Sequence, residues 1–531
     1  MNFSTRLLPA KLPQKSSGFP LLHPRLFHLP PNYTTTNTNF TPVVGLEIHA
    51  QLKNNTKLFS ASDPRFDQNV NSNLSLFDIA IPGSMPVLNK NVLYKAAKTV
   101  ISLKGSIQQE TDFQRKHYFY PDQPLGYQIT QQNKPIGIGG HLILGKFDGL
   151  NYERKIRIKQ IQIEQDTAKT INDTNPIYDL IDYNRSGAAL LEIVTEPDIR
   201  SAEEATLFLK KIILVLQTIE SSKALMEEGS LRCDVNVSLD FNFSDSENKL
   251  NSNSLESFKK GPRVEIKNLN SLRSVTNAIE SEIQRQISVL FDGGEISSET
   301  RSYDVIAKQT KSSRTKESKP DYRFMPEADI PTIHLSHKWI ENIKKELPEF
   351  PDDKKNRLSD QYGLSIDDIN VLYKIPTIID FFEKVCSLGI CPKEAYFWIS
   401  GEIFRLINYH KPNFTENIPI TPQEFGSLLK SIENSDLTSS MVKKILITRF
   451  DGDKKTIPEI ISINGWNLID NKLDLIALCK DIINNNPKQV EKYKSTKNNR
   501  LLGFFVGKVI AESKGNAKPQ IVSEIIKQLL K

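Results

Sequence analysis

The sequence predicts an α+β protein, in which an antiparallel-sheet cradle domain is followed by a helical domain and a small all-helical tail domain. Three observations support this prediction. Residues 43–52 and 231–238 alternate between apolar and polar side chains, which is the period of a half-buried strand. Beyond Pro331 the spacing of apolar residues becomes helical. The length of 531 residues exceeds what one core organises and favours about three domains.

Composition narrows the class of protein. A hydrophobic content of 38% is enough for globular cores, and no stretch approaches the roughly 18 unbroken apolar residues of a membrane helix, so we expect no membrane association. The net charge of +6 is compatible with a polyanionic partner but does not identify one. The four cysteines form no C-x-x-C pair, which argues against a thiolate zinc site and against a disulfide framework.

Residues 1–41 differ in composition from the rest of the chain. They contain basic, hydroxyl, proline and asparagine residues, and the first carboxylate is Glu47. This composition is typical of an organellar transit peptide, although a simple disordered tail has similar features. We favour a transit peptide to the mitochondrial matrix over one to a plastid.

The domain limits follow from changes in composition and in the spacing of apolar residues along the chain. Residues 42–331 are assigned to the cradle domain, with an Asn- and Ser-rich disordered insertion at about 240–262. Residues 332–413 are assigned to the helical domain, in which Pro348, Pro351 and Pro376 separate helices. Residues 414–531 form a Lys-rich tail that either contacts RNA or carries an ordinary solvated face. Its helices are predicted at 421–433, 438–450, 470–485, 486–509 and 519–530.

The strand at 43–52 places Glu47 and His49 side by side on its polar face. A carboxylate beside an imidazole can bind a divalent cation or act as an acid–base pair, whereas the alternative is a solvated strand face. A helix is predicted over 91–104. Arg115 and Lys116 then precede the aromatic residues 118–120, which suits a nucleotide or RNA site but equally a cationic rim around a core.

Residues 140–147 have the glycine and lysine spacing of a P-loop. Phe147 replaces the required Ser or Thr, and the intervening residues are strand-like, so we reject this interpretation. Glu164 and Asp166 share one face of the strand that follows. Ser201 and Glu204 form a predicted capping box at the start of a helix that extends to about residue 219.

The strand at 231–238 directs Arg232 and Asp234 outward with Asn236 and Ser238, after a turn that contains Glu228. Four successive polar side chains either line a ligand site or form a solvated face. Cys233 lies on the apolar side and is therefore expected in the core. A further helix is predicted to end near residue 291, before two glycines.

Several motifs occur in a fixed order and resemble the B-subunit (GatB) family of glutamyl-tRNA(Gln) amidotransferases, particularly its mitochondrial members. The resemblance runs from about Pro42 to the C-terminus and rests on residues 44–49 (VGLEIH), 82–89 (PGSMPVLN), 115–122 (RKHYFYPD), 126–129 (GYQI), 182–185 (DYNR), 191–198 (LEIVTEPD), 226–238, 265–271 (EIKNLNS), 321–323 (DYR) and 326–327 (PE).

The resemblance implies a function. Members of this family belong to an ATP-dependent carbon–nitrogen ligase that acts on Glu-tRNA(Gln). ATP phosphorylates the glutamyl side chain, and ammonia displaces the phosphate to give Gln-tRNA(Gln) for mitochondrial translation. An amidase A subunit releases the ammonia from glutamine, and a small C subunit joins A to B. The resemblance also implies that the tail binds the tRNA.

Phosphoryl transfer requires charge neutralisation and positioning, so the polar strands are the expected site. The expected metal-site residues are Glu47, His49 and Glu164, with Glu228 and Asp234 as further candidates, and the metal is Mg²⁺ or Mn²⁺. Arg115 and Lys116 are expected to contact the ATP phosphates together with Arg232. The expected catalytic group comprises Glu47, His49, Arg232 and Asp234.

The chain departs from the family pattern at Gln165, where a glutamate is usual, and at Ala188 and Ala189, where a proline is usual. Gln165 either weakens a metal site or lies outside it. Ser60 and Ser62 occupy the neighbourhood of zinc-binding cysteines found in some bacterial relatives, so no zinc is expected. Two other functions remain in competition, namely an RNA-binding subunit without phosphoryl transfer and a standalone metal-dependent ATPase.

Overall fold

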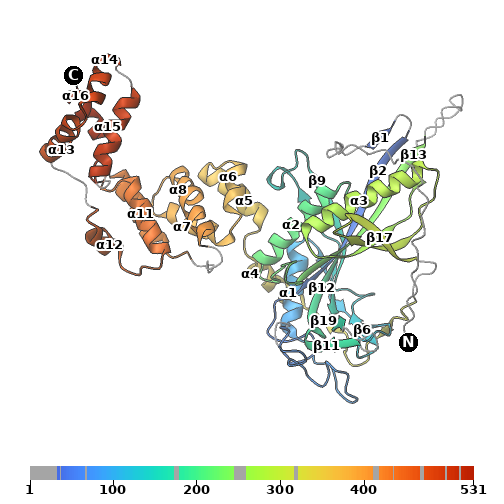
Figure 1. Ribbon diagram of the computed structural model, residues 1–531. Coiled ribbons are helices and arrows are strands. Elements are labelled where there is room, and N and C mark those ends of the chain that lie inside the picture. Colours follow the sequence, from blue (N-terminus) through green and yellow to red (C-terminus); the bar gives the residue numbers. More distant parts are fainter. Residues whose placement is uncertain are drawn as a thin grey trace, which may run out of the picture. The chain divides into compact units, whose positions relative to one another are not determined.

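The computed structural model describes residues 33–35, 38–65, 69–172, 179–243, 259–315, 321–410, 418–434, 436–466, 472–496, 499–513 and 516–530. These residues form two compact units, one that ends at Pro348 and one that begins at Glu349 (Figure 1). The predicted transit peptide lies almost entirely outside the described residues. The predicted domain limits at 331 and 413 remain predictions.

The first unit is built on one large sheet. At its centre, β2 (Thr38–Gln51) lies between β12 (Ala189–Thr195) and β13 (Leu231–Phe243), and both pairings are antiparallel. The predicted antiparallel cradle is confirmed, although β15 and β16 pair in parallel. From one edge to the other the strand order is β17 (Gln309–Thr315), β16 (Glu299–Asp304), β15 (Val264–Leu269), β13, β2, β12, β9 (Arg154–Gln165), β6 (Tyr127–Thr130), β5 (Gln114–His117) and β18 (Met325–Pro326).

Short strands complete this unit. The strand β8 (His141–Leu144) pairs with β9, which confirms that the four residues between the two glycines of the P-loop-like segment form a strand. The remaining short strands are β1 (Tyr33–Thr35), β3 (Ser106–Ile107), β7 (Gly137–Ile138) and β14 (Lys259–Lys260) on the large sheet, and the separate pairs β10 (Lys169–Asn172) with β11 (Asp179–Asp182) and β4 (Glu110–Thr111) with β19 (Ile333–His334).

The alternation of the central strands separates a buried apolar face from a polar one. Leu46, Ile48 and Cys233 are buried in a single core, as predicted for Cys233. The helices α1 (Lys90–Ser102), α2 (Ala202–Thr218) and α3 (Leu272–Phe291) contribute apolar side chains to this core. Burial of these side chains is the main stabilising term of the unit. The opposite face of the same strands carries the polar side chains.

The three predicted helices of this unit are confirmed, and their caps explain where they begin. The Ser201 hydroxyl accepts a hydrogen bond from the Glu204 backbone N–H, at 3.1 Å. The second half of the predicted capping box is wrong, because the Glu204 carboxylate does not return to Ser201. It is buried and instead accepts hydrogen bonds from the Arg200 backbone N–H, the Tyr152 hydroxyl and the Arg154 guanidinium.

The predicted disordered insertion is wrong at its borders. The strand β13 continues to Phe243, and β14 pairs with it through Asp240 opposite Lys260 and Phe241 opposite Lys259. The apolar residues of this strand, which include Leu239 and Phe241, continue its two-residue period, so the strand persists beyond the point where the composition changes. Residues 244–258 lie outside the described residues.

The helix α4 (His337–Glu346) belongs to the first unit, and the second unit is helical. Pro351 and Pro376 occupy the first turns of α5 and α7, where the missing N–H costs nothing. The first helices of this unit are α5 (Pro351–Tyr362), α6 (Ile366–Leu372), α7 (Pro376–Ser387), α8 (Pro392–Trp398), a π-helical turn (Ile399–Ile403), α9 (Phe404–Tyr409), α10 (Pro422–Glu433), α11 (Ser439–Phe450) and α12 (Ile457–Asn464).

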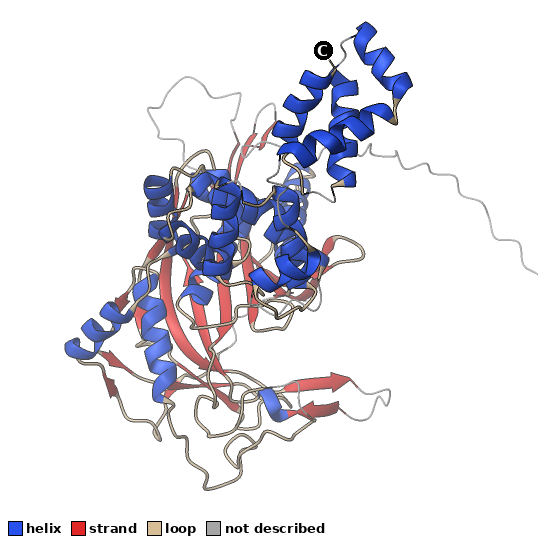
Figure 2. Cartoon of the chain, turned by 90° about the vertical axis from the view of Figure 1, so that its left-hand side faces the viewer, coloured by secondary structure: helices blue, strands red, loops and turns tan. Residues whose placement is uncertain are grey.

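The C-terminal helices α13 (Lys472–Asn484), α14 (Pro487–Thr496), α15 (Asn499–Glu512) and α16 (Pro519–Leu529) share a core that includes Phe505 and Ile526. They are the group of helices next to the marked C-terminus in Figure 2. The single helix predicted over 486–509 is wrong, because α14 and α15 are separate elements. The helix α12 was not predicted from the sequence. Among the described residues, no helix is both long enough and apolar enough to cross a bilayer.

Candidate functional site

The polar face of the central sheet carries several of the predicted site residues. His49 on β2 lies opposite Arg232 on β13 and opposite Glu192 on β12. Glu192 in turn lies opposite Gln162 on β9. Because directly opposed residues project to the same side of a sheet, these four side chains form a row across four strands.

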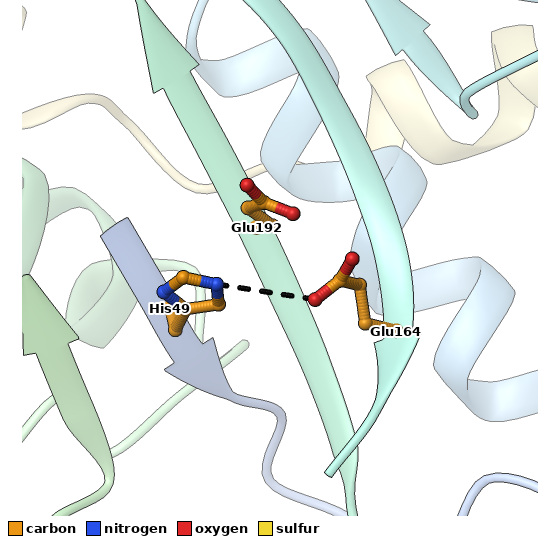
Figure 3. Close-up of side chains that lie close together, drawn as sticks. All are labelled: His49, Glu164 and Glu192. Carbon is orange, nitrogen blue, oxygen red and sulfur yellow. Dashed lines mark ion pairs between the residues drawn. The ribbon is translucent and has the colours of Figure 1, made fainter. Parts of the chain in front are cut away.

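An acid cluster lies on this row. His49, Glu164 and Glu192 each offer one ligand atom, and these three atoms lie within 4.8 Å of one another. Nε2 of His49 is 3.9 Å from Oε2 of Glu164. Figure 3 shows Glu192 on the middle strand, between His49 and Glu164. Within the described residues, this is the one group of three or more His, Cys and acidic residues with such a spacing.

Polar neighbours fix the two carboxylates of the acid cluster. Oε1 of Glu164 accepts hydrogen bonds from the Thr130 hydroxyl at 2.6 Å and from Nε2 of Gln162 at 3.0 Å. The same Gln162 amide donates to Oε2 of Glu192 at 2.6 Å. Nε2 of Gln128 donates to Oε2 of Glu164 at 3.3 Å. The carboxylates are therefore held before any ligand arrives.

The two carboxyl groups have opposite pKa shifts. Burial raises the pKa of Glu192 well above its usual range, and the neighbouring Glu164 carboxylate adds to this increase. Burial also acts to raise the pKa of Glu164, but the Lys116 ammonium and the His49 imidazole outweigh it and lower that pKa. The two carboxyl groups are therefore coupled, so that the charge on one affects the proton affinity of the other.

The residues of the acid cluster fit a divalent cation. Two carboxylate oxygens and one imidazole nitrogen converge, and a cation between them would relieve the repulsion that raises the pKa of Glu192. Oxygen ligands suit Mg²⁺, and the imidazole is better suited to Mn²⁺. His49 and Glu164 were anticipated from the sequence as metal-site residues.

The other predicted metal residues lie outside the acid cluster. Glu47 accepts a hydrogen bond from Nδ2 of Asn236 at 2.9 Å and lies opposite Asp234 on β13. Asp234 forms an ion pair with Lys267 at 3.1 Å. Glu228 is exposed on a turn and pairs with Lys223 at 3.5 Å. Of these, Glu47 and Asp234 share the polar face, whereas Glu228 has a different environment.

Two of the predicted phosphate-binding cations are differently placed. Both Nε and Nη2 of Arg115 bind the carboxylate of Glu327, at 2.8 and 2.7 Å, and Nη2 also lies 3.3 Å from Asp329. Its charge is thus already matched within the fold. Lys116 instead lies near the acid cluster, where its ammonium is the strongest cationic influence on the pKa of Glu164.

The third predicted cation, Arg232, is partly anchored. Its Nη2 lies 3.3 Å from both carboxylate oxygens of Asp166, and Asp166 also accepts a hydrogen bond from Nε of Arg185 at 2.5 Å. The Arg232 side chain is 40% exposed. It can therefore present the rest of its guanidinium to an anionic ligand beside His49.

Glu192 was not predicted as a site residue from the sequence. The alternation of β12 indicates that Glu192 points away from the core, but only strand pairing brings it between His49 and Glu164. Gln165 is the opposite case, because the sequence raised it as a residue that could weaken a metal site. It follows Glu164 on β9, projects to the opposite face and is buried there, so it lies outside the acid cluster.

Comparison with known proteins assigns both parts of the chain to one group. Residues 42–341 match the family described as the GatB/GatE catalytic domain, and residues 380–530 match the family described as the GatB domain.

The full-length relatives agree. The chain is 38% identical over 499 residues to the B subunit of the mitochondrial glutamyl-tRNA(Gln) amidotransferase of Naegleria gruberi, with 92% of this chain and 94% of that protein covered. It is 40% identical over 493 residues to the B subunit of the aspartyl/glutamyl-tRNA(Asn/Gln) amidotransferase of Coxiella burnetii, with 92% and 99% covered. The corresponding protein of Bacillus velezensis is 36% identical over 495 residues, with 93% and 99% covered.

Proposed function

The chain belongs to the GatB family of amidotransferase B subunits, and from this premise we propose that it activates Glu-tRNA(Gln) for amidation. A carboxylate oxygen of the glutamyl side chain attacks the γ-phosphorus of ATP, and ADP leaves. Ammonia then attacks the acyl-phosphate carbon, and phosphate leaves with the formation of Gln-tRNA(Gln). The chain is thus a subunit of a carbon–nitrogen ligase.

The acid cluster of His49, Glu164 and Glu192 is the observation that carries the proposal. Phosphoryl transfer to a carboxylate brings two anions together, so its main requirement is charge neutralisation at fixed positions. A divalent cation bound by these three residues would supply that neutralisation. Thr130, Gln128 and Gln162 hold the ligand atoms in place and so remove the need for reorganisation.

Two cations flank the acid cluster and have proposed roles in binding phosphate. Arg232 lies opposite His49 on the neighbouring strand, with its carboxylate partner Asp166 behind it. Lys116 lies on the other side and influences Glu164 directly. Guanidinium and ammonium groups bind phosphate oxygens by charge-assisted hydrogen bonds. Glu47 and Asp234 extend the polar face beyond this pair and are proposed to position the nucleotide.

We further propose that ammonia comes from partner chains. The relatives are named as B subunits, which supports a complex of several chains, and an amidase A subunit with a small linking C subunit would complete it. The Naegleria relative is named as mitochondrial and supports the same compartment for this chain, with the matrix as its proposed location. The Lys-rich C-terminal helices are proposed to bind the tRNA body.

The test is a reconstituted complex supplied with Glu-tRNA(Gln), ATP and ammonium chloride in place of glutamine. Ammonium bypasses the partner's glutaminase, so phosphate release and Gln-tRNA(Gln) report on this chain. Replacing Glu192 by Gln keeps the shape of the side chain and removes a ligand charge. We expect a loss of at least about 100-fold in both products, with unchanged tRNA affinity.

The matched control is Glu228→Gln, because Glu228 is an exposed acid on a turn with only a lysine partner. It is expected to retain wild-type rates. Turnover of ATP without tRNA would instead favour a standalone ATPase, and tRNA binding without ATP use by the whole complex would favour a non-catalytic RNA-binding role. Wild-type activity of Glu192→Gln would remove the acid cluster from the reaction.

A further inference from the structure

A row of aromatic rings lies beside the acid cluster. The ring centroids of Tyr120 and Tyr118 are 5.8 Å apart, those of Tyr118 and Tyr322 are 6.4 Å apart, and those of Tyr322 and Phe324 are 6.1 Å apart. We call these four residues together with Phe119 the aromatic ridge. Most of its members fill no core, since Phe119, Tyr120 and Phe324 are exposed, and Phe119 is 87% exposed.

The aromatic ridge is built from two segments that the fold joins firmly. The backbone N–H of His117 donates to the Tyr322 carbonyl at 2.9 Å. The strand β5, which ends just before Tyr118, pairs with β18, which begins just after Phe324. Phe119 lies against Gly126, where a Cβ would come within 3.2 Å of its ring. An open cavity is lined by Phe119, Tyr120, Pro121 and residues 123–126. The exposed rings are therefore presented by a fixed scaffold.

Basic side chains lie next to the rings of the aromatic ridge. The Lys116 ammonium lies 5.0 Å from the centroid of Tyr322, over its face. Arg323 lies between the two ridge residues of its segment, is largely exposed and has Asp321 as an ion-pair partner at 3.8 Å. His117 directs Nδ1 at the Arg323 carbonyl, at 2.9 Å. Exposed aromatic faces interleaved with cations are the pattern of a surface that stacks unpaired nucleobases.

The aromatic ridge is also continuous with the acid cluster. Lys116 overlies Tyr322 and lies opposite Gln128 on β6, whose Nε2 donates to Oε2 of Glu164 at 3.3 Å. Tyr118 lies near enough to Glu164 and Asp166 for their charges to add to the effect of burial in raising its pKa. A substrate carried on the end of a nucleic acid strand would thus have its terminal nucleotides on the ridge when its reactive group reaches the acid cluster.

We infer that the aromatic ridge is the subsite for the unpaired acceptor end of the aminoacyl-tRNA, with Phe119 and Tyr120 stacking on its terminal bases. The inference rests on the proposed function, because it identifies where that substrate is held. It assigns to the exposed rings a role in tRNA affinity that is separate from the phosphoryl-transfer chemistry.

The test compares Phe119→Ala, Phe119→Trp and the control Ile306→Ala in the reconstituted complex. Ile306 is 96% exposed on the turn between β16 and β17, so its loss matches the removal of exposed apolar surface. Each complex is titrated with intact tRNA(Gln) that carries 2-aminopurine in place of the terminal adenosine, and with the same tRNA lacking its unpaired acceptor end. Sedimentation of each complex monitors the association of its chains.

Phe119→Ala is expected to weaken binding of intact tRNA by about 5- to 100-fold, as loss of one stacked base does. It is expected to leave binding of the shortened tRNA unchanged and to abolish quenching of 2-aminopurine. Phe119→Trp is expected to restore both, and Ile306→Ala to alter neither. Unchanged affinity for intact tRNA, or equal weakening for both tRNAs, overturns the inference.

Dissociation of the complex by Phe119→Ala would show that the ridge is instead a protein interface and would equally overturn the inference. Failure of the proposed function has a different signature, because the wild-type complex would then release no phosphate and make no Gln-tRNA(Gln). Stacking at the ridge is measured as tRNA affinity and 2-aminopurine quenching without turnover, so the two failures are distinguishable.

Discussion

Glu164 and Glu192 lie on adjacent antiparallel strands, and a single amide joins their carboxylates. Nε2 of Gln162 donates to Oε1 of Glu164 at 3.0 Å and to Oε2 of Glu192 at 2.6 Å. Two acidic side chains at this separation repel each other unless a proton, a donor or a cation lies between them. The amide supplies the donor, and the proposed metal supplies the cation.

The first prediction concerns this shared amide. Gln162→Leu removes both hydrogen bonds while keeping a side chain of similar size, so the carboxylates lose their orientation. We expect the affinity for Mn²⁺ to fall by about 10- to 100-fold, the usual effect of losing a group that orients metal ligands. Titration of free Mn²⁺ by electron paramagnetic resonance measures it. An unchanged affinity would mean that Gln162 does not orient the ligands.

The second prediction separates Glu47 from the acid cluster. Its carboxylate is held by Asn236, and a glutamine at position 47 can still accept that hydrogen bond. We therefore expect Glu47→Gln to bind Mn²⁺ much more tightly than Glu192→Gln does, and nearly as tightly as the wild type. The same titration compares the three proteins. Equal losses in both variants would place Glu47 among the metal ligands.

The third prediction concerns a buried ion pair. The Lys57 ammonium is fully buried and lies 3.1 Å from Oδ2 of Asp78, which also accepts a hydrogen bond from Ser60. Lys57→Met leaves that carboxylate buried without its cation, and such losses cost about 3–5 kcal/mol. Urea unfolding followed by fluorescence measures the change.

The control for that experiment is Lys53→Met, because Lys53 is an exposed residue only four positions away. Its replacement is expected to change the unfolding free energy by no more than about 0.5 kcal/mol. Equal stability of the two variants would show that the Lys57–Asp78 pair contributes little.

The fourth prediction uses the cysteines. Cys233 is fully buried on β13, and burial raises the pKa of its thiol well above the usual range, whereas Cys391 is exposed. Because the thiolate is the reactive form, iodoacetamide is expected to label Cys391 rapidly and Cys233 only after unfolding. Mass spectrometry of the peptides gives both rates. Fast labelling of Cys233 in the native protein would contradict its place in the core.

Local pattern was sufficient to predict much of this architecture. The two-residue period of β2 and β13 gives the sidedness of His49, Arg232 and Cys233 directly. The position of Glu192 between His49 and Glu164 could not be predicted in this way, because strand order and register depend on pairings between distant segments.

Two other predictions from the sequence were wrong for reasons that lie in the local sequence. At 240–243 the composition suggested disorder, but strand pairing continued because the apolar alternation persisted. At 486–509 the boundary between α14 and α15 falls at residues 495–499 (STKNN), most of which are weak helix formers, and the prediction of one helix overlooked this local signal. Arg115 illustrates a different limit, since the sequence shows its charge but not that Glu327 already neutralises it.

The most direct test of the central claim is pulsed electron paramagnetic resonance of Mn²⁺ bound to the complex. If the acid cluster is the metal site, the bound Mn²⁺ shows coupling to an imidazole nitrogen. That coupling disappears in His49→Gln, and the bound metal itself is largely lost in Glu164→Gln and Glu192→Gln. A bound Mn²⁺ without nitrogen coupling, or one that survives both glutamate replacements, would contradict the account.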